Sequence, residues 1–321
     1  RINDAACNLI ITADGSFRGN KVLDLKSIVD TALESCPSIL HCIVLERTKG
    51  TVTMKAGRDL WWSEITAGVS SACAAEAMGA EDELFVLYTS GSTGKPKGVV
   101  HSTAGYMVYA EYSFRNVFQY EQGDLFWCTA DIGWITGHSY VIYGPLLAGA
   151  TSLMFEGVPT FPDAGRFWEV VDKHQVNIFY TAPTAIRALE AKGLAYVKPY
   201  KLDSLKVLGS VGEPINEEAW QWYHKNIGKE KCPIVDTWWQ TETGGMMIAP
   251  LAGLTKLKPT YASLPLPGIQ PCLVDAKGNE IEGNDVEGNL CIKYPWPSMI
   301  RTTYGDHARC KQVYFSTFKG I

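Results

Sequence analysis

The stretch YTSGSTGKPKGVVH, residues 88–101, decides how the rest of the chain is interpreted. It follows an apolar run at residues 84–87 and consists mostly of glycine, hydroxylated residues and lysine. Glycines let successive backbone N–H groups turn toward one point, and Lys95 and Lys97 add positive charge, so the stretch suits phosphate oxygens. It is not a Walker A loop, because Pro96 stands where that motif requires Ser or Thr. A solvated surface turn is the alternative that composition alone leaves open.

Strand and helix patterns alternate on both sides of this loop. A strand is predicted at 84–89 and a buried helical stripe follows at positions 106, 109, 110, 114, 117 and 118, so we expect the loop to join a strand to a helix. Further helices are predicted at 25–33 and from Asn216, as N-cap, to Gly228. The other predicted strands are 8–12, 42–46, 125–129, 151–156, 176–181, 205–211 and 234–239. This alternation predicts an α/β fold with helices packed on largely parallel sheets.

The character of the chain changes beyond about Gly245. Proline and glycine become frequent, and the short runs CLVDAKG (272–278) and NLCIKY (289–294) are typical of strands. We therefore predict an α/β portion over residues 1–245 and a smaller, antiparallel β-rich portion of the same domain over residues 246–321.

Composition excludes several classes of protein. A net charge of −5 gives no general attraction for nucleic acid or anionic membranes, and no apolar run approaches the ~18 residues of a membrane span. The nine cysteines form no C-x-x-C pair, which favours reduced thiols and a cytoplasmic location, with the nucleus or an organelle as alternatives. The chain starts without Met and enters a strand-like run at once, so we expect it to be part of a longer protein.

Three further motifs follow the loop in order: DIGWITGHSY (131–140), GSVGEPIN (209–216) and DTWWQTETGG (236–245). Together with the loop, they resemble the ANL adenylate-forming superfamily, and the resemblance covers almost the whole chain. It implies that a carboxylic acid reacts with ATP to give an acyl-adenylate and pyrophosphate, after which the acyl group passes to coenzyme A. Adenylation brings two anions together, so it depends on alignment and charge neutralisation.

The resemblance assigns nucleotide-binding roles to specific residues. The ATP phosphate loop would comprise Thr89, Ser90, Gly91, Ser92, Thr93, Gly94 and Lys95. The adenylate would contact Gly212, Glu213, Pro214, Asp236, Thr237, Trp238, Trp239, Gln240 and Thr241. Glu242 would lie near Mg²⁺, and its alternative role is that of an acid in the first turn of a helix. Ordinary core packing is the alternative for Trp238.

The acid to be activated is inferred from the same resemblance. Its pocket would be formed by Trp134, Thr136, Val211 and Trp239. Trp239 matches the tryptophan that closes the pocket in acetate-activating members, so acetate is the expected substrate and propionate a poorer one. A propionate-preferring or other short-chain acyl-CoA ligase is the alternative, and core packing is the alternative for Trp134.

Coenzyme A would contact Arg18, Gly19, Asn20, Lys21, Thr136 and Thr160. Asn20 replaces a glycine common in the family, and Lys21 stands where some members have arginine, which loses the fork geometry of a guanidinium. A solvated turn is the alternative for 18–21 and for Thr160.

The expected substrates and cofactors are therefore acetate, ATP, Mg²⁺ and coenzyme A, without nucleic acid or membrane partners. The resemblance places the catalytic lysine in a C-terminal domain that this chain does not contain, and it implies a further N-terminal portion. The chain alone is thus expected to be incomplete, with a non-catalytic nucleotide-binding protein as the alternative. The sequence does not determine an oligomeric state.

Overall fold

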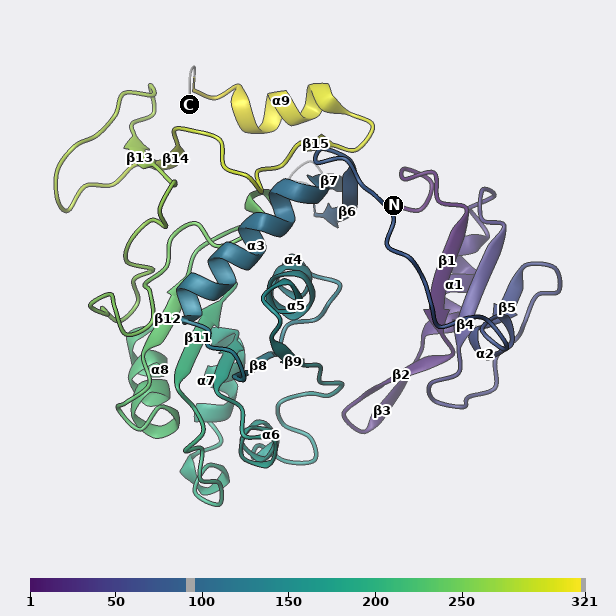
Figure 1. Cartoon of the computed structure of the whole chain (residues 1–321), viewed down its shortest axis with the longest axis horizontal. Helices are drawn as coiled ribbons and strands as arrows, with labels where there is room; N and C mark the ends of the chain where they lie inside the picture. Colours follow the sequence, from purple (N-terminus) through teal and green to yellow (C-terminus); the bar gives the residue numbers. More distant parts are fainter. Residues whose placement is uncertain (91–95, 319–321) are drawn as a thin grey trace. The chain divides into compact units, whose positions relative to one another are not determined.

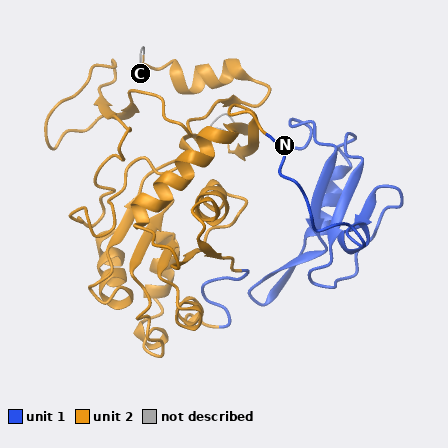
Figure 2. Ribbon diagram, viewed as in Figure 1, with its two compact units in different colours: residues 1–77, 156–162 blue, residues 78–155, 163–321 orange. Residues whose placement is uncertain are grey.

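The computed structural model describes residues 1–90 and 96–318, and the chain divides into two compact units (Figure 2). Unit 1 comprises residues 1–77 and 156–162, and unit 2 comprises residues 78–155 and 163–321. The β-rich portion expected from residue 246 lies within unit 2, and the division of one domain into two portions near residue 245 stays a prediction.

Unit 1 contains a small parallel sheet of β1 (Leu9–Ala13), β4 (His41–Leu45) and β5 (Asp59–Trp61), in the order β1-β4-β5. Helix α1 (Leu25–Leu33) contributes Leu33 to a core with Cys42 and Val44. Asp24 caps α1 by accepting a hydrogen bond from the Ser27 N–H at 3.0 Å. A hairpin of β2 (Gly15–Arg18) and β3 (Lys21–Asp24) precedes α1, and the short α2 (Trp62–Ile65) follows β5.

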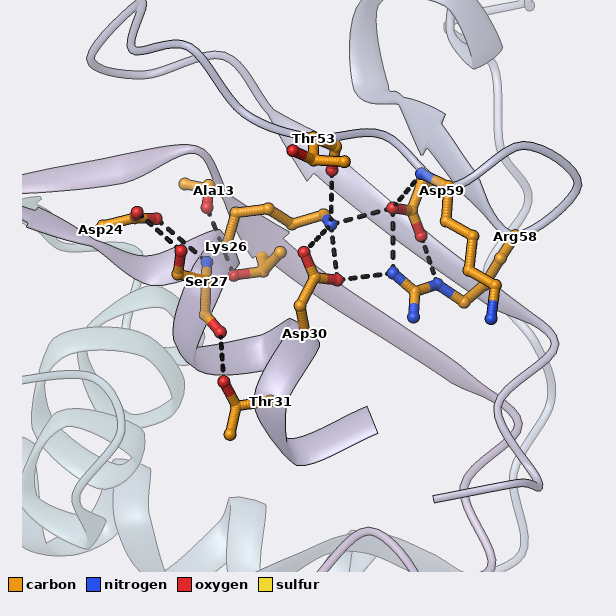
Figure 3. A network of polar contacts seen from close by, with 11 residues as sticks. Ala13, Asp24, Lys26, Ser27, Asp30, Thr31, Thr53, Arg58 and Asp59 are labelled. Atoms are coloured by element: carbon orange, nitrogen blue, oxygen red, sulfur yellow. Dashed lines mark hydrogen bonds and ion pairs between the residues drawn. The ribbon is translucent and has the colours of Figure 1, made fainter. Parts of the chain in front are cut away.

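A buried ion network fastens α1 to the segment around β5 (Figure 3). The Lys26 side chain is 1% exposed, and its Nζ donates to Asp30 at 2.7 Å and to the Thr53 carbonyl at 3.1 Å and lies 2.8 Å from Asp59 Oδ2. Arg58 Nε donates to Asp59 at 2.5 Å, and its Nη2 bonds to Asp30 at 2.5 Å. Each buried charge therefore has an opposite charge within hydrogen-bonding distance, which a buried ion requires.

Unit 2 is built on a five-stranded parallel sheet in the order β12-β11-β10-β8-β9 (Figure 1). Its strands are β8 (Leu125–Cys128), β9 (Thr151–Leu153), β10 (Ile178–Thr181), β11 (Val207–Val211) and β12 (Ile234–Thr237). Neighbouring residues of one strand enter different cores: Phe126 packs with Phe114 of α3 (Thr103–Phe118), whereas Trp127 packs with Phe167 of α6 (Arg166–His174). Both faces are buried, which explains why these strands are continuous apolar runs.

The remaining helices cover this sheet. The stripe predicted for α3 is buried, which confirms that helix. Helix α8 begins after Asn216 and passes into the π-helical turn η3 before Gly228, which confirms the predicted span. The other bounds are α4 (Ile135–Gly137), η1 (His138–Tyr143), α5 (Gly144–Leu147), α7 (Pro183–Glu190), η2 (Leu194–Tyr196), α8 (Glu217–Trp222), η3 (Tyr223–Ile227) and η4 (Thr241–Thr243). The α/β fold predicted from the sequence is confirmed.

The expected strand-to-helix connection at the phosphate loop is wrong. The loop joins β6 (Glu83–Thr89) to the antiparallel β7 (Lys97–Ser102), and α3 begins only at Thr103. β7 is central in its sheet, because Val99 and Val100 pair with β6 on one side and with β15 (Thr302–Thr303) on the other. That second partner is distant in the sequence, so local patterns gave no sign of it.

The predicted antiparallel β unit is confirmed by β13 (Pro271–Val274) and β14 (Asn289–Ile292). Helix α9 (His307–Phe315) was not anticipated. Only Cys310 of this helix is buried, so its sequence carries little apolar periodicity. Among the described residues, no helix is long and apolar enough to cross a membrane.

Candidate active site

The carboxyl ends of β11 and β12 lie side by side at one edge of the parallel sheet. Val211 pairs with Thr237 in register, so the segments 212–214 and 238–241 leave the sheet at the same edge. Ligands of open α/β sheets bind outside this edge. Gly212 has a φ of +96°, which L-residues with side chains rarely adopt, and this allows the sharp exit from β11. The structure thus brings together two of the predicted adenylate-binding segments.

Glu213 ties the first of these segments to α7. Its Oε1 accepts a hydrogen bond from the Thr184 N–H at 2.7 Å and another from Arg187 Nη2 at 3.0 Å. The carboxylate therefore caps the beginning of α7 and fixes the turn that precedes Pro214. Because the side chain of Glu213 is occupied in this way, the backbone of 212–214 is the part available to a nucleotide.

Asp236 and Thr237 form the rigid end of β12. Burial raises the pKa of Asp236 to about 6. Thr237 Oγ1 donates to the Ser210 carbonyl at 2.9 Å and accepts from the Tyr180 hydroxyl at 2.6 Å. A buried carboxyl group with a raised pKa at a ligand-binding edge is typical of a functional site.

The two tryptophans after β12 are both partly buried. Trp238 continues the backbone pairing, because its N–H donates to the Ile248 carbonyl at 2.8 Å. The ring of Trp239 meets the ring of Tyr140 edge-on, with centroids 5.0 Å apart and an interplanar angle of 85°. Trp239 also packs against the cluster that contains Ile135, so it lies between two apolar cores.

The predicted wall of the acyl pocket is only partly apolar core. Val211 is buried and Thr136 is partly buried, but the Trp134 residue is 71% exposed, which excludes core packing for Trp134. Ile135, which we did not single out, is buried in a cluster against which Trp239 packs. The roles of these residues in acid binding stay predictions.

The hairpin places Thr89 and Ser90 at the start of the phosphate loop. Of the other predicted loop residues, Gly91, Ser92, Thr93, Gly94 and Lys95 lie outside the described residues. Thr89 Oγ1 is buried and has no hydrogen-bond partner in the described ranges, which suits a ligand oxygen. At Gly98 a Cβ atom would lie 2.8 Å from Val86 Cγ1, so only glycine allows the strands to approach this closely.

Glu242 lies near the other end of the loop. Its Oε1 accepts a hydrogen bond from the Tyr314 hydroxyl at 2.5 Å and lies 3.9 Å from Lys97 Nζ. Lys97 Nζ also donates to the Tyr314 hydroxyl at 2.7 Å. The Glu242 backbone is held as well, because its carbonyl accepts from the Ile300 N–H at 2.9 Å.

His101 ties β7 to the same turn. Its Nε2 donates to the Thr241 carbonyl at 2.8 Å, and burial lowers the pKa of His101 to about 4. The imidazole is therefore neutral at physiological pH and acts as a structural hydrogen-bond donor. This agrees with adenylation, which needs no general base because the acid is already ionised.

The residues present fit Mg²⁺ only in company with a nucleotide. Within the described ranges there is no group of three His, Cys, Asp or Glu side chains that could hold a metal ion. Mg²⁺ in phosphate-transferring sites is commonly bound by one or two carboxylates together with substrate phosphates. Glu242 provides one such carboxylate, and its side chain is 20% exposed.

The predicted coenzyme A residues fall in both units. Arg18 and Lys21 pair at the tip of the β2–β3 hairpin, and Gly19 between them has a φ of +62°. A Cβ atom on Gly19 would lie 3.6 Å from Val158, so this tip lies beside the segment that carries Thr160. Unit 1 therefore brings together all of the predicted residues except Thr136, which belongs to unit 2.

A sequence model of the family described as "AMP-binding enzyme" matches residues 1–302. The chain belongs to the AMP-binding enzyme family. This confirms the superfamily resemblance inferred from the four motifs. The edge formed by β11 and β12, the hairpin loop and the turn with Glu242 are thus parts of an AMP-binding enzyme.

Several curated members of the AMP-binding enzyme family are similar over the whole chain. An acetyl-coenzyme A synthetase of Bradyrhizobium diazoefficiens is 58% identical over 320 residues, covering 100% of this chain and 49% of that protein. One of Alkalilimnicola ehrlichii is 57% identical over 321 residues, covering 100% and 50%. Acetyl-coenzyme A synthetase 2 of Pseudomonas aeruginosa is 57% identical over 320 residues, covering 100% and 50%. The chain spans about half the length of these relatives.

Sequence reasoning missed residues that approach this site from a distance. Lys97 was noted for its charge alone, because its pairing with Thr89 belongs to strand β7, which the sequence did not predict. Tyr314 comes from the unexpected helix α9, and no local signal connects it to Glu242.

Proposed function

We propose that the intact protein containing this chain activates acetate with ATP to acetyl-adenylate and pyrophosphate, then transfers the acetyl group to coenzyme A. The observation that carries this proposal is the identity of 57–58%, across all four motifs, to proteins described as acetyl-coenzyme A synthetases. In this proposal the intact protein is an AMP-forming acid–thiol ligase.

In this proposal the edge of β11 and β12 binds the adenylate. The backbone of 212–214 lines the adenine, Trp238 packs on it, and Asp236 accepts or donates a hydrogen bond at its polar rim. Thr241 contacts the α-phosphate, and Gln240 lies next to it. The neutral His101 holds the Thr241 carbonyl, which orients this turn.

The hairpin loop binds the phosphates that leave as pyrophosphate. Thr89 and Ser90 begin this site, and the rest of the loop completes it. Glu242 would hold Mg²⁺, which when bound would supply positive charge next to the phosphates. Fixed donors and cations of this kind stabilise the developing charge without reorganisation.

The acyl pocket determines which acid is used. Trp239 closes it, and Val211, Thr136 and Trp134 supply the remaining wall. An apolar pocket discriminates by only ~1–3 kcal/mol per methylene, so propionate is the second substrate and butyrate a much poorer one.

Coenzyme A binds at residues 18–21, Thr160 and Thr136 in the second half-reaction. The cationic side chains of Arg18 and Lys21 suit the phosphates of its nucleotide portion. We place the protein in the cytoplasm, which fits nine free cysteines.

The test is acid-dependent exchange of pyrophosphate into ATP by the intact protein with acetate, propionate and butyrate. We expect rates to fall in that order, and we expect Trp239→Gly to raise the rate with butyrate relative to acetate by at least tenfold. Tyr196→Phe, a change on the exposed surface, should leave the order unchanged. Equal wild-type rates with acetate and butyrate would overturn the role of Trp239, and absence of exchange with all three acids would overturn the function.

A further inference from the structure

One side chain of helix α9, that of Tyr314, contacts the candidate metal ligand Glu242. The Tyr314 hydroxyl donates to Glu242 Oε1 at 2.5 Å and accepts from Lys97 Nζ at 2.7 Å. The three residues come from α9, from η4 and from β7, so the cluster joins three elements that are distant in the sequence. The Lys97 and Glu242 side chains are only 11% and 20% exposed, so water competes weakly for these bonds.

Other contacts fix α9 without Tyr314. Cys310 is buried with Val99 and Ile300 in a small apolar core. The Tyr304 N–H donates to the Gly98 carbonyl at 2.8 Å, and Arg309 Nη1 donates to the Pro96 carbonyl at 3.4 Å. Helix α9 and the turn before it therefore have contacts with the hairpin that do not involve the Tyr314 hydroxyl.

The contacts of the Tyr314 hydroxyl make it a donor to Glu242. Its oxygen accepts a hydrogen bond from Lys97 Nζ at 2.7 Å, so its own proton is directed to Glu242 Oε1 at 2.5 Å. Bonds between a hydroxyl and a carboxylate are short and about twice as strong as bonds between neutral groups. The bond at 2.5 Å thus fixes one oxygen of Glu242, and among the described residues the other oxygen, Oε2, has no hydrogen-bond partner.

We propose that Tyr314 is a positioning residue for Glu242, holding its carboxylate together with Lys97 so that Oε2 binds Mg²⁺ carried by ATP. The inference rests on the proposed function and deepens it, because it adds the residue that orients the metal ligand. Partners of this kind are typically worth about 10- to 100-fold in metal affinity.

The experiment measures ATP binding rather than turnover. ATP affinity of the intact protein is determined by calorimetry at a series of Mg²⁺ concentrations and again with EDTA. For Tyr314→Phe we expect the Mg²⁺ concentration that gives half of the affinity gain to rise about tenfold. ATP affinity in EDTA should change by less than about twofold, because the bond acts through the metal ligand.

A second variant separates positioning from docking of the helix. Cys310→Ala loosens the packing of α9 but leaves all atoms of the Tyr314–Glu242–Lys97 cluster in place. We expect Cys310→Ala to lower the melting temperature while leaving the Mg²⁺ dependence unchanged. An equal shift in both variants would overturn the proposal, and so would an unchanged Mg²⁺ dependence in Tyr314→Phe.

The wild-type protein distinguishes this inference from the function on which it rests. If wild type binds ATP with the help of Mg²⁺ and Tyr314→Phe does so equally well, only the inference fails. If wild type binds no ATP with or without Mg²⁺, the proposed function fails together with it.

Discussion

Each unit contains a lysine that is almost completely buried, and the two lysines differ in the charged groups that surround their Nζ atoms. Lys26 in unit 1 is 1% exposed and has Asp30, Asp59 and the Thr53 carbonyl around its Nζ within 3.1 Å (Figure 3). The Lys97 side chain in unit 2 is 11% exposed, and its Nζ donates to the Tyr314 hydroxyl and lies 3.9 Å from Glu242 Oε1. The first charge is fully compensated by the protein, whereas the second is only partly compensated.

This difference separates a structural charge from a functional one. In unit 1, burial alone would raise the pKa of Asp59, but hydrogen bonds from Arg58 and Lys26 outweigh it and hold that pKa well below the usual range. The charges of this network, all of them on described residues, are paired with one another, so the network has no unpaired charge for a ligand. At Lys97 the positive charge is balanced only in part by its own contacts, and the loop predicted to bind phosphates ends two residues before it, at Lys95. An anionic ligand close to Lys97 would balance the part of its positive charge that the protein does not.

The largest effect, a loss of stability in unit 1, is expected for Lys26→Met. Removing one partner of a buried ion pair leaves Asp30 and Asp59 under-compensated, which typically costs about 3–5 kcal/mol. Hydrogen exchange of peptides from residues 1–77 should therefore speed up strongly, while ATP binding to unit 2 is preserved. Lys55→Met, which removes an exposed lysine of the same unit, is the matched control. Unchanged exchange in Lys26→Met would break the comparison, because the network would then not be structural.

The second-largest effect is expected in the pH dependence of stability. It arises at His101, a titratable group that unit 2 buries in its neutral form. The pKa of His101 is about 4 when folded, against about 6.5 when unfolded. Stability from the neutral imidazole is thus complete above pH 6.5 and is lost as pH falls toward 4, by up to ~3 kcal/mol. The difference in the free energy of unfolding between wild type and His101→Gln should therefore decrease by that amount between pH 7 and pH 4.

Urea unfolding of both proteins across this range provides the measurement. His174→Gln, which changes an exposed histidine on α6, should follow the wild-type profile. The Asp59 network depends on a carboxylate with a lowered pKa, so its contribution is lost only below about pH 4. Parallel profiles for wild type and His101→Gln would mean that the imidazole is not buried in its neutral form.

The parallel sheet could be predicted from the sequence because its strands are buried on both faces. A run such as FWC at 126–128 is apolar at every position, since Phe126 and Trp127 serve different cores. Strand β7 could not be predicted, because its identity depends on pairing with Thr302 and Thr303 about 200 residues away. A short run before a strong helix pattern carries no local sign of such a partner.

The site shows the same limit. The residues at the ends of β11 and β12 could be located because each motif follows its strand directly, and parallel strands end at a common edge. Ile135 was passed over beside the more conspicuous Trp134, although only Ile135 is buried near Trp239. Tyr314 could not be found at all, because its partner Glu242 is brought to it only by the tertiary fold.

Lys97→Met should affect ligand binding more than stability. Hydrogen bonds to charged groups contribute about 1.5–3 kcal/mol, so we expect affinity for ATP with Mg²⁺ to fall about 10- to 100-fold. The melting temperature should change little, because Tyr314 and Glu242 keep their mutual bond. Calorimetric titration measures the affinity, and Lys311→Met on the exposed side of α9 is the control. A large loss of stability with normal ATP affinity would make Lys97 a second structural lysine like Lys26.

The smallest effect is expected for Lys206→Met, which tests whether burial decides the outcome. Lys206 Nζ donates to Asp124 at 2.7 Å, as close as Lys26 to Asp30, but the Lys206 side chain is 50% exposed. Exposed pairs contribute about 0.2–1 kcal/mol and weaken with salt. Urea unfolding in 0.1 M and 1 M NaCl should show a loss within that range that shrinks at high salt, with Lys198→Met as control. A salt-independent loss of stability as large as that of Lys26→Met would contradict this. It would mean that the distance between the charges, and not their burial, determines how much an ion pair contributes to the free energy of unfolding.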